Sequence, residues 1–154
     1  MARPLDTSLF KTIVANTPLI SIDLVVQDSQ NRILLGKRLN RPAKNYWFVP
    51  GGRVRKDETL ADAFTRLAKE ELGFPISIQN AAFIGTFEHF YPDNFSEEDF
   101  STHYVVLGYK LVIETPLVQL PKDQHSQYCW RAVDDLLSAD DVHLHTKLYF
   151  QDRK

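Results

Sequence analysis

The chain has 154 residues, of which 44% are hydrophobic, and a formal net charge of −2. This length is enough for a sizeable buried core, so we expect one domain over residues 1–154, and the small net charge excludes a general attraction to nucleic acid or to an anionic membrane. A single cysteine, Cys129, excludes an internal disulfide and fits a reducing compartment. Residues 1–10 lack the apolar stretch of a signal peptide, and no run of apolar residues reaches membrane-spanning length. We therefore expect a cytoplasmic protein.

The first third of the chain predicts a helix, a β-hairpin and a glycine turn. We expect the helix to end before Pro18, and a short strand to lead into Pro50-Gly51-Gly52. These elements are expected at residues 8–16 for the helix, 19–27 and 32–38 for the hairpin strands with their turn at 28–31, and 46–49 for the short strand.

Residues 60–72 predict an amphipathic helix that stops at Gly73. Leu67 belongs to its apolar stripe, and Glu71 follows four residues later on the same face. A carboxylate on a buried face needs a cation or hydrogen-bond donors around it, and Mg²⁺ prefers oxygen ligands. The pattern leaves two interpretations open: Glu71 binds a metal ion, or it pairs with an arginine.

The rest of the chain predicts further strands, two long loops and a terminal helix. A mixed sheet flanked by helices follows, so the expected fold class is α/β with an α/β/α sandwich. The expected elements are one or two strands in 76–88, a polar and aromatic loop at 89–101, a strand at 102–113, a loop at 116–127, a strand at 128–133, a helical turn at 134–138 and a helix at 142–153.

One motif carries chemistry: residues 52–74 read GRVRKDETLADAFTRLAKEELGF. They resemble the box of Nudix hydrolases, Gly-x5-Glu-x7-Arg-Glu-U-x-Glu-Glu-x-Gly-U, where U is apolar. Leu67 departs from it, because the box has a glutamate there. The resemblance implies a metal-dependent hydrolase of a nucleoside diphosphate linked to another group, with the usual metal cluster reduced. The matching positions are Gly52, Glu58, Arg66, Glu70, Glu71, Gly73 and Phe74, and Ala68 fits the small apolar position.

The flanks of the box resemble one branch of this family, the GDP-mannose mannosyl hydrolases. In that branch water attacks the anomeric carbon of the sugar with inversion, and GDP leaves intact. The resemblance implies a Nudix-type α/β/α sandwich, one Mg²⁺ per active site, a GDP-sugar substrate and a homodimer. It lies in GKRLNRPAKNYWFVPGGRV (residues 36–54), HFYPDNFS (89–96), THYVVLGY (102–109) and PKDQHSQYCW (121–130).

The resemblance assigns the metal ligands and the base. Mg²⁺ is expected on the backbone carbonyl of Gly51, the carboxylate of Glu71 and the side chain of Gln124, while Glu70 is expected to stay at the helix surface or to support the site indirectly. His125 is the expected general base, since a neutral imidazole can take a proton from water at pH 7. The alternative is an exposed loop histidine.

Four side chains are expected around the reacting sugar and its leaving group. Arg38 and Tyr104 match residues that steady the departing diphosphate, for which a guanidinium fork is well suited. Asp23 matches an aspartate that contacts the sugar and supports positive charge at the anomeric carbon; the alternative is an outward-facing strand position. Arg53 is expected near the diphosphate, and Arg66 is expected to brace Glu58.

Substrate contacts are also expected from His89 and from an N-terminal segment that reads guanine across the homodimer, here Pro4, Leu5 and Phe10. The histidines at 143 and 145 are expected at the surface or at the start of the last helix.

Three functions remain open. The leading one is hydrolysis of GDP-mannose, or of GDP-glucose, to GDP and the free sugar. The second is an ordinary Nudix pyrophosphatase that cuts between the phosphates. The third, suggested by Leu67, is an inactive nucleotide-sugar binding module.

Overall fold

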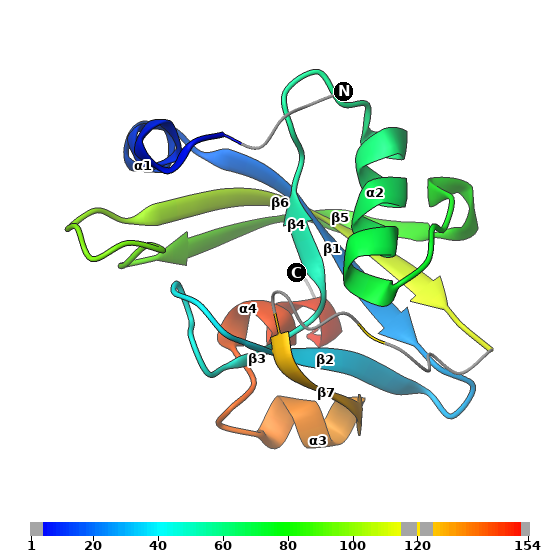
Figure 1. The fold of residues 1–154 in the computed structure, drawn as a ribbon. Coiled ribbons are helices and arrows are strands. Elements are labelled where there is room, and N and C mark those ends of the chain that lie inside the picture. Colours follow the sequence, from blue (N-terminus) through cyan, green and yellow to red (C-terminus); the bar gives the residue numbers. More distant parts are fainter. Residues whose placement is uncertain (1–4, 115–119, 121–124, 152–154) are drawn as a thin grey trace.

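The computed structural model describes residues 5–114, 120 and 125–151, with the backbone alone at 125 and 126. Within these residues seven strands form one mixed sheet of order β3-β2-β1-β6-β5, in which β4 pairs with β1 and β7 pairs with β2 (Figure 1). The strands are β1 (Leu19–Gln27), β2 (Arg32–Arg38), β3 (Trp47–Phe48), β4 (Gly51–Arg53), β5 (Ala82–Tyr91), β6 (Thr102–Val112) and β7 (His125–Ala132).

The central strand β1 has different partners along its length, and this opens the sheet. It pairs in parallel with β6 from end to end, but it pairs with β2 only at Gln27 and Ile33, beside the hairpin turn. At its other half β4 takes the place of β2, with Asp23 opposite Gly51. The strands β1 and β2 therefore diverge, as Figure 1 shows, and a cleft can form where they separate.

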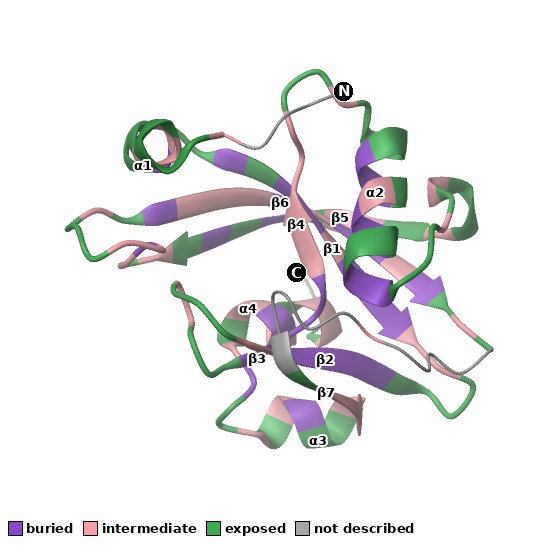
Figure 2. Ribbon diagram, in the orientation of Figure 1, coloured by how far each residue is buried: buried purple, intermediate pink, exposed green. Residues whose placement is uncertain are grey.

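Two hydrophobic cores lie on opposite faces of the sheet. Alternate side chains of β1 divide between them: Leu24 and Val26 join the core under α2 (Leu60–Leu72), whereas Val25 joins the core under α3 (Val133–Ser138). Figure 2 shows buried residues on the sheet and on the helix surfaces that meet it. The expected α/β/α sandwich with a mixed sheet is confirmed.

The helix α2 begins and ends where the sequence predicts. Thr59 caps its start by accepting a hydrogen bond from the Asp62 amide. Gly73 ends it in the left-handed region, at φ 94°, which favours glycine. The apolar stripe is buried, with Phe64 fully enclosed and Leu67 2% exposed.

The remaining helical segments are short. The helix α1 (Thr7–Asn16) confirms the first prediction within a residue. A 3₁₀ turn η1 (Ile78–Asn80) precedes β5. Near the C-terminus lie α4 (Leu144–Lys147) and the 3₁₀ turn η2 (Leu148–Phe150). Among the described helices, none has the length and apolar character needed to cross a membrane.

Three predicted boundaries are wrong. Residues 89–91 belong to β5 and not to a loop, because their pairing with β6 continues to Tyr91 opposite Thr102. Residues 125–127 belong to β7, which pairs with β2. The predicted helix at 142–153 starts later, since Val142 instead forms a bridge with Trp47. The segment that follows consists of α4 and η2 and is not one continuous helix.

Candidate active site

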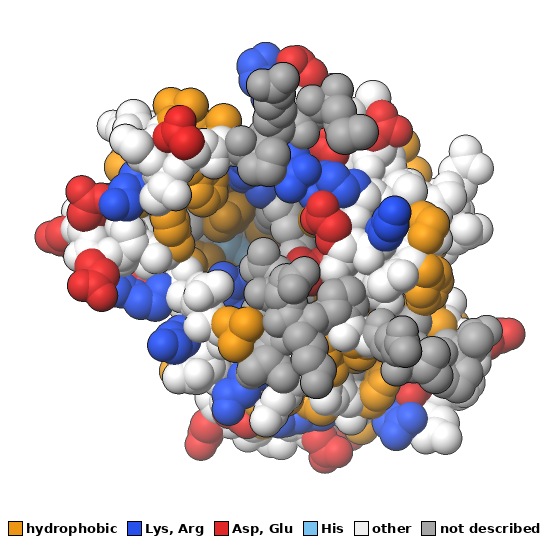
Figure 3. Space-filling view, viewed as in Figure 1, with side chains coloured by type: hydrophobic (Ala, Val, Ile, Leu, Met, Phe, Trp, Pro, Cys, Tyr) orange, Lys and Arg blue, Asp and Glu red, His pale blue; other side chains and the backbone are white. Residues whose placement is uncertain are grey.

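The cleft where β1 and β2 diverge contains two adjoining cavities. The smaller, of about 100 Å³, is called here the Asp23 cavity; the larger, of about 340 Å³, is called the arginine cavity. In Figure 3 basic side chains gather beside the hollow on this face. The two cavities share Arg38, Pro42, Gly51, Gly52, Arg53, Glu71 and Tyr104, so they form one continuous site.

The helix α2 presents one carboxylate to both cavities. Glu71 is 6% exposed and lines them both. Leu67, one turn earlier, packs against the glycine turn so closely that a Cβ added at Gly52 would lie 2.5 Å from Leu67 Cδ2. Where the box has a glutamate, this chain therefore has an apolar side chain in close contact with Gly52.

The other charged residues of the box form a brace. Arg66 donates hydrogen bonds of 2.7 and 2.8 Å to the two carboxylate oxygens of Glu58, and one of 2.9 Å to the Arg53 carbonyl. These hydrogen bonds lower the pKa of Glu58 and raise that of Arg66. Glu70 pairs with Arg66 at 3.0 Å. The bracing role predicted for Arg66 is confirmed. Glu70 lies in an ion pair, is half-exposed and also lines the arginine cavity.

The predicted metal ligands fall partly within the described residues. Gly51 and Glu71 line the same cavities, whereas Gln124 lies outside the described residues. No cluster of three or more histidine, cysteine, aspartate or glutamate side chains suited to a metal occurs in the described part of the chain. One buried carboxylate and a nearby carbonyl are hard oxygen donors, and they fit a single Mg²⁺ that keeps positions for substrate and water.

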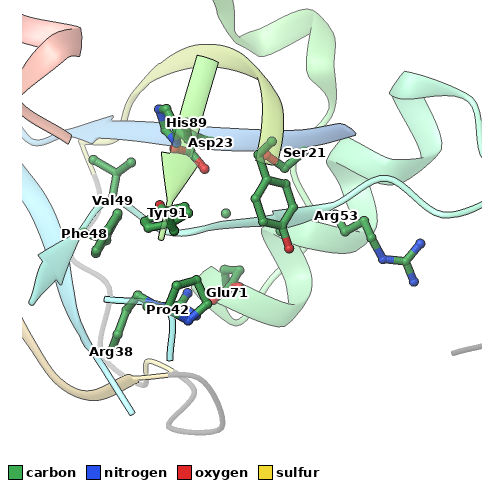
Figure 4. Close-up of a pocket in the computed structure, with 13 residues that line it drawn as sticks. Ser21, Asp23, Arg38, Pro42, Phe48, Val49, Arg53, Glu71, His89 and Tyr91 are labelled. Atoms are coloured by element: carbon green, nitrogen blue, oxygen red, sulfur yellow. The ribbon is translucent and has the colours of Figure 1, made fainter. Parts of the chain in front are cut away.

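Asp23 lies opposite Gly51 in the β1–β4 pair and lines the smaller cavity. A Cβ added at Gly51 would come within 2.3 Å of Asp23 Oδ1, so only glycine fits there. Burial raises the pKa of Asp23 to about 7, although a hydrogen bond from Tyr149 and the charge of Arg38 act to lower it. The alternative of an outward-facing Asp23 is wrong, because the side chain lines the cleft. Figure 4 shows Asp23 and His89 on one side of the cavity, with Arg38 and Glu71 opposite.

Two arginines of the cleft have no ion pair with a carboxylate among the residues that the structure describes. They are Arg38, whose Nε donates to the Pro42 carbonyl at 3.1 Å, and Arg53, whose guanidinium lies 5.3 Å from the Phe10 ring centroid. Other arginines of the larger cavity are neutralised by carboxylates: Arg41 by Asp93, Arg55 by Glu70 and Arg66 by Glu58. Arg38 and Arg53 therefore leave positive charge available for an anion.

Tyr104 lines both cavities beside these arginines. Burial raises its pKa above the usual value, so its hydroxyl keeps the proton at neutral pH and can donate a hydrogen bond. Arg38, Arg53 and Tyr104 therefore lie together in the cleft.

Of the histidines, His89 differs from the prediction in position. His89 is a strand residue, 3% exposed, and lines the Asp23 cavity. Its ring stacks on His145 with centroids 4.4 Å apart; burial and the neighbouring histidines lower its pKa to about 3, so it is neutral at pH 7. His143 caps the start of α4 and His145 lies within it, so the expected place at the start of the last helix is confirmed. Both side chains are half-buried. The backbone of His125 lies opposite Arg38 in the β2–β7 pair.

Of the three N-terminal residues expected to contact guanine, Phe10 lies in the cleft. Phe10 lines the arginine cavity, and its ring lies 5.0 Å from that of Phe95, from the loop between β5 and β6. Leu5 lines neither cavity, and Pro4 lies outside the described residues.

Several cleft residues escaped the sequence interpretation. Phe48, Tyr91 and Phe95 lie in segments that were singled out, and aromatic side chains beside a candidate site could have suggested them. Tyr149 carried no signal, because its contact with Asp23 joins positions 126 residues apart.

Comparison with known proteins identifies the family. The NUDIX domain family model matches residues 17–151. The chain belongs to the Nudix family. Low-salt glycan biosynthesis protein Agl8 of Haloferax volcanii is 44% identical over 118 residues, which are 77% of this chain and 73% of that protein. An ADP-ribose pyrophosphatase of Methanocaldococcus jannaschii is 41% identical over 56 residues, 36% of this chain and 32% of that protein.

Solved Nudix structures share the fold. The MutT NUDIX hydrolase from Burkholderia pseudomallei has a TM-score of 0.69 and 24% identity, covering 87% of this chain and 96% of that one. The NUDIX domain of Shewanella oneidensis NrtR, complexed with ADP ribose, has a TM-score of 0.67 and 18% identity, covering 95% and 96%. The family match and the near-complete box make this protein a Nudix hydrolase.

Proposed function

We propose that this Nudix hydrolase cleaves a nucleoside diphosphate sugar at the sugar carbon and releases the nucleoside diphosphate and the free sugar. GDP-mannose is the first substrate to test, and GDP-glucose the second. The observation that carries the proposal is the pairing of two features in one cleft: Leu67 packs where the box has a glutamate, and Asp23 lines a small cavity suited to a sugar.

The arginine cavity suits the diphosphate. Arg38 and Arg53 supply positive charge and form no ion pair with a described carboxylate, and Tyr104 adds a hydrogen-bond donor. Charge-assisted hydrogen bonds of this kind are stronger than neutral ones. They stabilise the negative charge that grows on the leaving oxygen as its bond to the sugar breaks.

The Asp23 cavity suits the sugar ring. Its carboxylate stands beside polar and aromatic side chains, among them His89 and Tyr91. The transition state of glycoside hydrolysis carries positive charge near the anomeric carbon, so a carboxylate at this place stabilises it more than it stabilises the ground state.

The reaction balances without a further reagent. The oxygen of water forms a bond to the anomeric carbon, and the bond from that carbon to the diphosphate oxygen breaks, with its electron pair leaving on the nucleoside diphosphate. His125 accepts the proton of the attacking water. Mg²⁺ on the Gly51 carbonyl, Glu71 and Gln124 would neutralise charge on the diphosphate.

The comparisons support a nucleotide-linked substrate. The relative with 44% identity is named for glycan biosynthesis, and glycans are built from activated sugars. The ADP-ribose pyrophosphatase similarity favours a second candidate function, cleavage between the phosphates. The expected homodimer, in which Pro4, Leu5 and Phe10 contact guanine, and the cytoplasmic location belong to the same proposal.

The deciding experiment is hydrolysis in ¹⁸O-labelled water with analysis of both products by mass spectrometry. We expect the label in the sugar and none in GDP. Label in a phosphate product indicates the pyrophosphatase, and a protein that binds GDP-mannose without turning it over indicates the inactive binding module.

A further inference from the structure

The C-terminal segment is anchored to the strand that leads into the glycine turn. The Trp47 amide donates to the Asp141 carbonyl at 2.8 Å, and the His143 amide donates back to the Trp47 carbonyl at 3.1 Å. One turn later, the hydroxyl of the fully buried Thr146 accepts a hydrogen bond from the Val49 amide at 3.3 Å. Residues 141–146 are therefore fixed to a wall of the cleft.

The next turn, η2, inserts the ring of Tyr149 under the sheet. The ring meets Phe87 edge-on, with centroids 4.6 Å apart. It also fills a space left by Gly108, where an added Cβ would lie 3.2 Å from Tyr149 Cε1. Close contacts on these sides leave the ring little freedom to move.

The hydroxyl of Tyr149 contacts two residues that line the Asp23 cavity. It donates a hydrogen bond of 2.5 Å to Asp23 Oδ2, and its oxygen lies 3.5 Å from His89 Nε2. Burial and the negative charge of Asp23 raise the pKa of Tyr149 well above its usual value, so the hydroxyl keeps its proton.

Both oxygens of Asp23 are thus in close contact with a neighbouring group. Oδ1 lies against the backbone of Gly51, and Oδ2 accepts from Tyr149. The last torsion of an aspartate has a broad, nearly two-fold energy profile, so an aspartate without such contacts samples a wide range of orientations. Catalysis benefits when a charged group is held in its productive orientation before the substrate arrives.

We infer that Tyr149 is a positioning residue of this active site, whose hydroxyl orients the Asp23 carboxylate toward the bound sugar. The inference rests on the proposed function for the role of Asp23. It makes the C-terminal segment part of the catalytic apparatus, although none of its described residues, up to 151, lines either cavity.

The test is a double-mutant cycle in the full chain with Tyr149→Phe, Asp23→Ala and the pair, assayed with GDP-mannose and Mg²⁺. We expect Tyr149→Phe alone to lower kcat/KM by about 10- to 100-fold, the usual effect of one hydrogen bond to a charged group. In the Asp23→Ala background the same change should cost less than about threefold, because no carboxylate remains to be oriented.

The matched control is Tyr109→Phe, which removes a hydroxyl from another buried tyrosine. Tyr109 packs on Phe64 and Phe83 and lines neither cavity, so kcat/KM should stay within about twofold of wild type. The inference is overturned if the loss of kcat/KM in the double variant equals the product of the two single losses. It is also overturned if Tyr149→Phe has the kcat/KM of the wild type. If Tyr149→Phe does not fold, Gly108→Ala, which crowds the Tyr149 ring, replaces it with the same expectations.

Thermal unfolding of the same four proteins gives a readout that needs no substrate. We expect the stability effects of Tyr149→Phe and Asp23→Ala to be non-additive, since both remove the same hydrogen bond; additive effects overturn the inference. If no GDP-sugar is hydrolysed, or if ¹⁸O appears in phosphate, the proposed function fails while the unfolding cycle still reports whether Tyr149 and Asp23 are coupled.

Discussion

The ionised carboxyl group of Asp23 serves the proposed reaction but destabilises the folded protein. Asp23→Asn should therefore raise the stability of the protein at alkaline pH. The pKa of Asp23 is 3.8 in an unperturbed chain and about 7 in the folded protein, chiefly because of burial. Between these values the folded protein holds a proton that the unfolded chain has lost. The contribution of Asp23 to the free energy of unfolding is therefore largest below pH 3.8, and it is lost as the pH rises through 7.

The magnitude follows from the size of the shift. About three pH units at 1.36 kcal/mol each set a ceiling of about 4 kcal/mol. Because the side chain is half-buried in an open cleft, water reduces this to about 1–3 kcal/mol. Asparagine keeps the shape and an acceptor for Tyr149 but cannot ionise. At pH 8 Asp23→Asn should thus raise Tm by about 2–10 °C, whereas at pH 4 the difference should be small.

The assay is differential scanning calorimetry at both pH values, with a chelator present so that metal binding does not contribute. Asp141→Asn is the control, because a hydrogen bond from Arg131 lowers the pKa of Asp141, whereas the pKa of Asp23 is raised. The Tm of Asp141→Asn should not rise at pH 8. An Asp23→Asn protein that is less stable than wild type at pH 8, or equally shifted at both pH values, would refute the reasoning.

Two further predictions concern the metal and the base. Glu71→Gln should weaken Mg²⁺ binding, measured by calorimetry, and cut turnover severely. Glu70→Gln should have a much milder effect, because Glu71 lines both cavities whereas Glu70 is held by Arg66. Equal losses of Mg²⁺ affinity in the two variants would contradict Glu71 as the single ligand from the helix. His125→Gln should lower kcat by roughly 10²–10⁴-fold and leave Mg²⁺ affinity nearly unchanged, because Gln124 and not His125 is the proposed ligand. Arg38→Gln should also slow the reaction, since Arg38 steadies the leaving group. A His125→Gln enzyme with near-normal kcat would move the base role elsewhere.

The sequence by itself determined the framework of the site. The apolar spacing of residues 60–72, followed by Gly73, predicted the helix α2 at its observed boundaries, because helix periodicity and a glycine stop are local properties of the chain. The same spacing placed Glu71 on the face of Leu67, and the near-complete box predicted the family that the comparison confirmed. The α/β class followed from the order of strand and helix signals.

The tertiary structure decided which distant residues meet. His89 became a buried strand residue because pairing with β6 extended β5 through Tyr91, and strand ends depend on partners that local sequence does not reveal. The terminal helix starts later than predicted because Val142 pairs with Trp47. The contact of Tyr149 with Asp23 needs the sheet, the anchored C-terminal segment and the space beside Gly108 at once. Local patterns predict most helices and strands of this protein, but packing across the sheet determines which residues surround Asp23, and these residues determine its pKa.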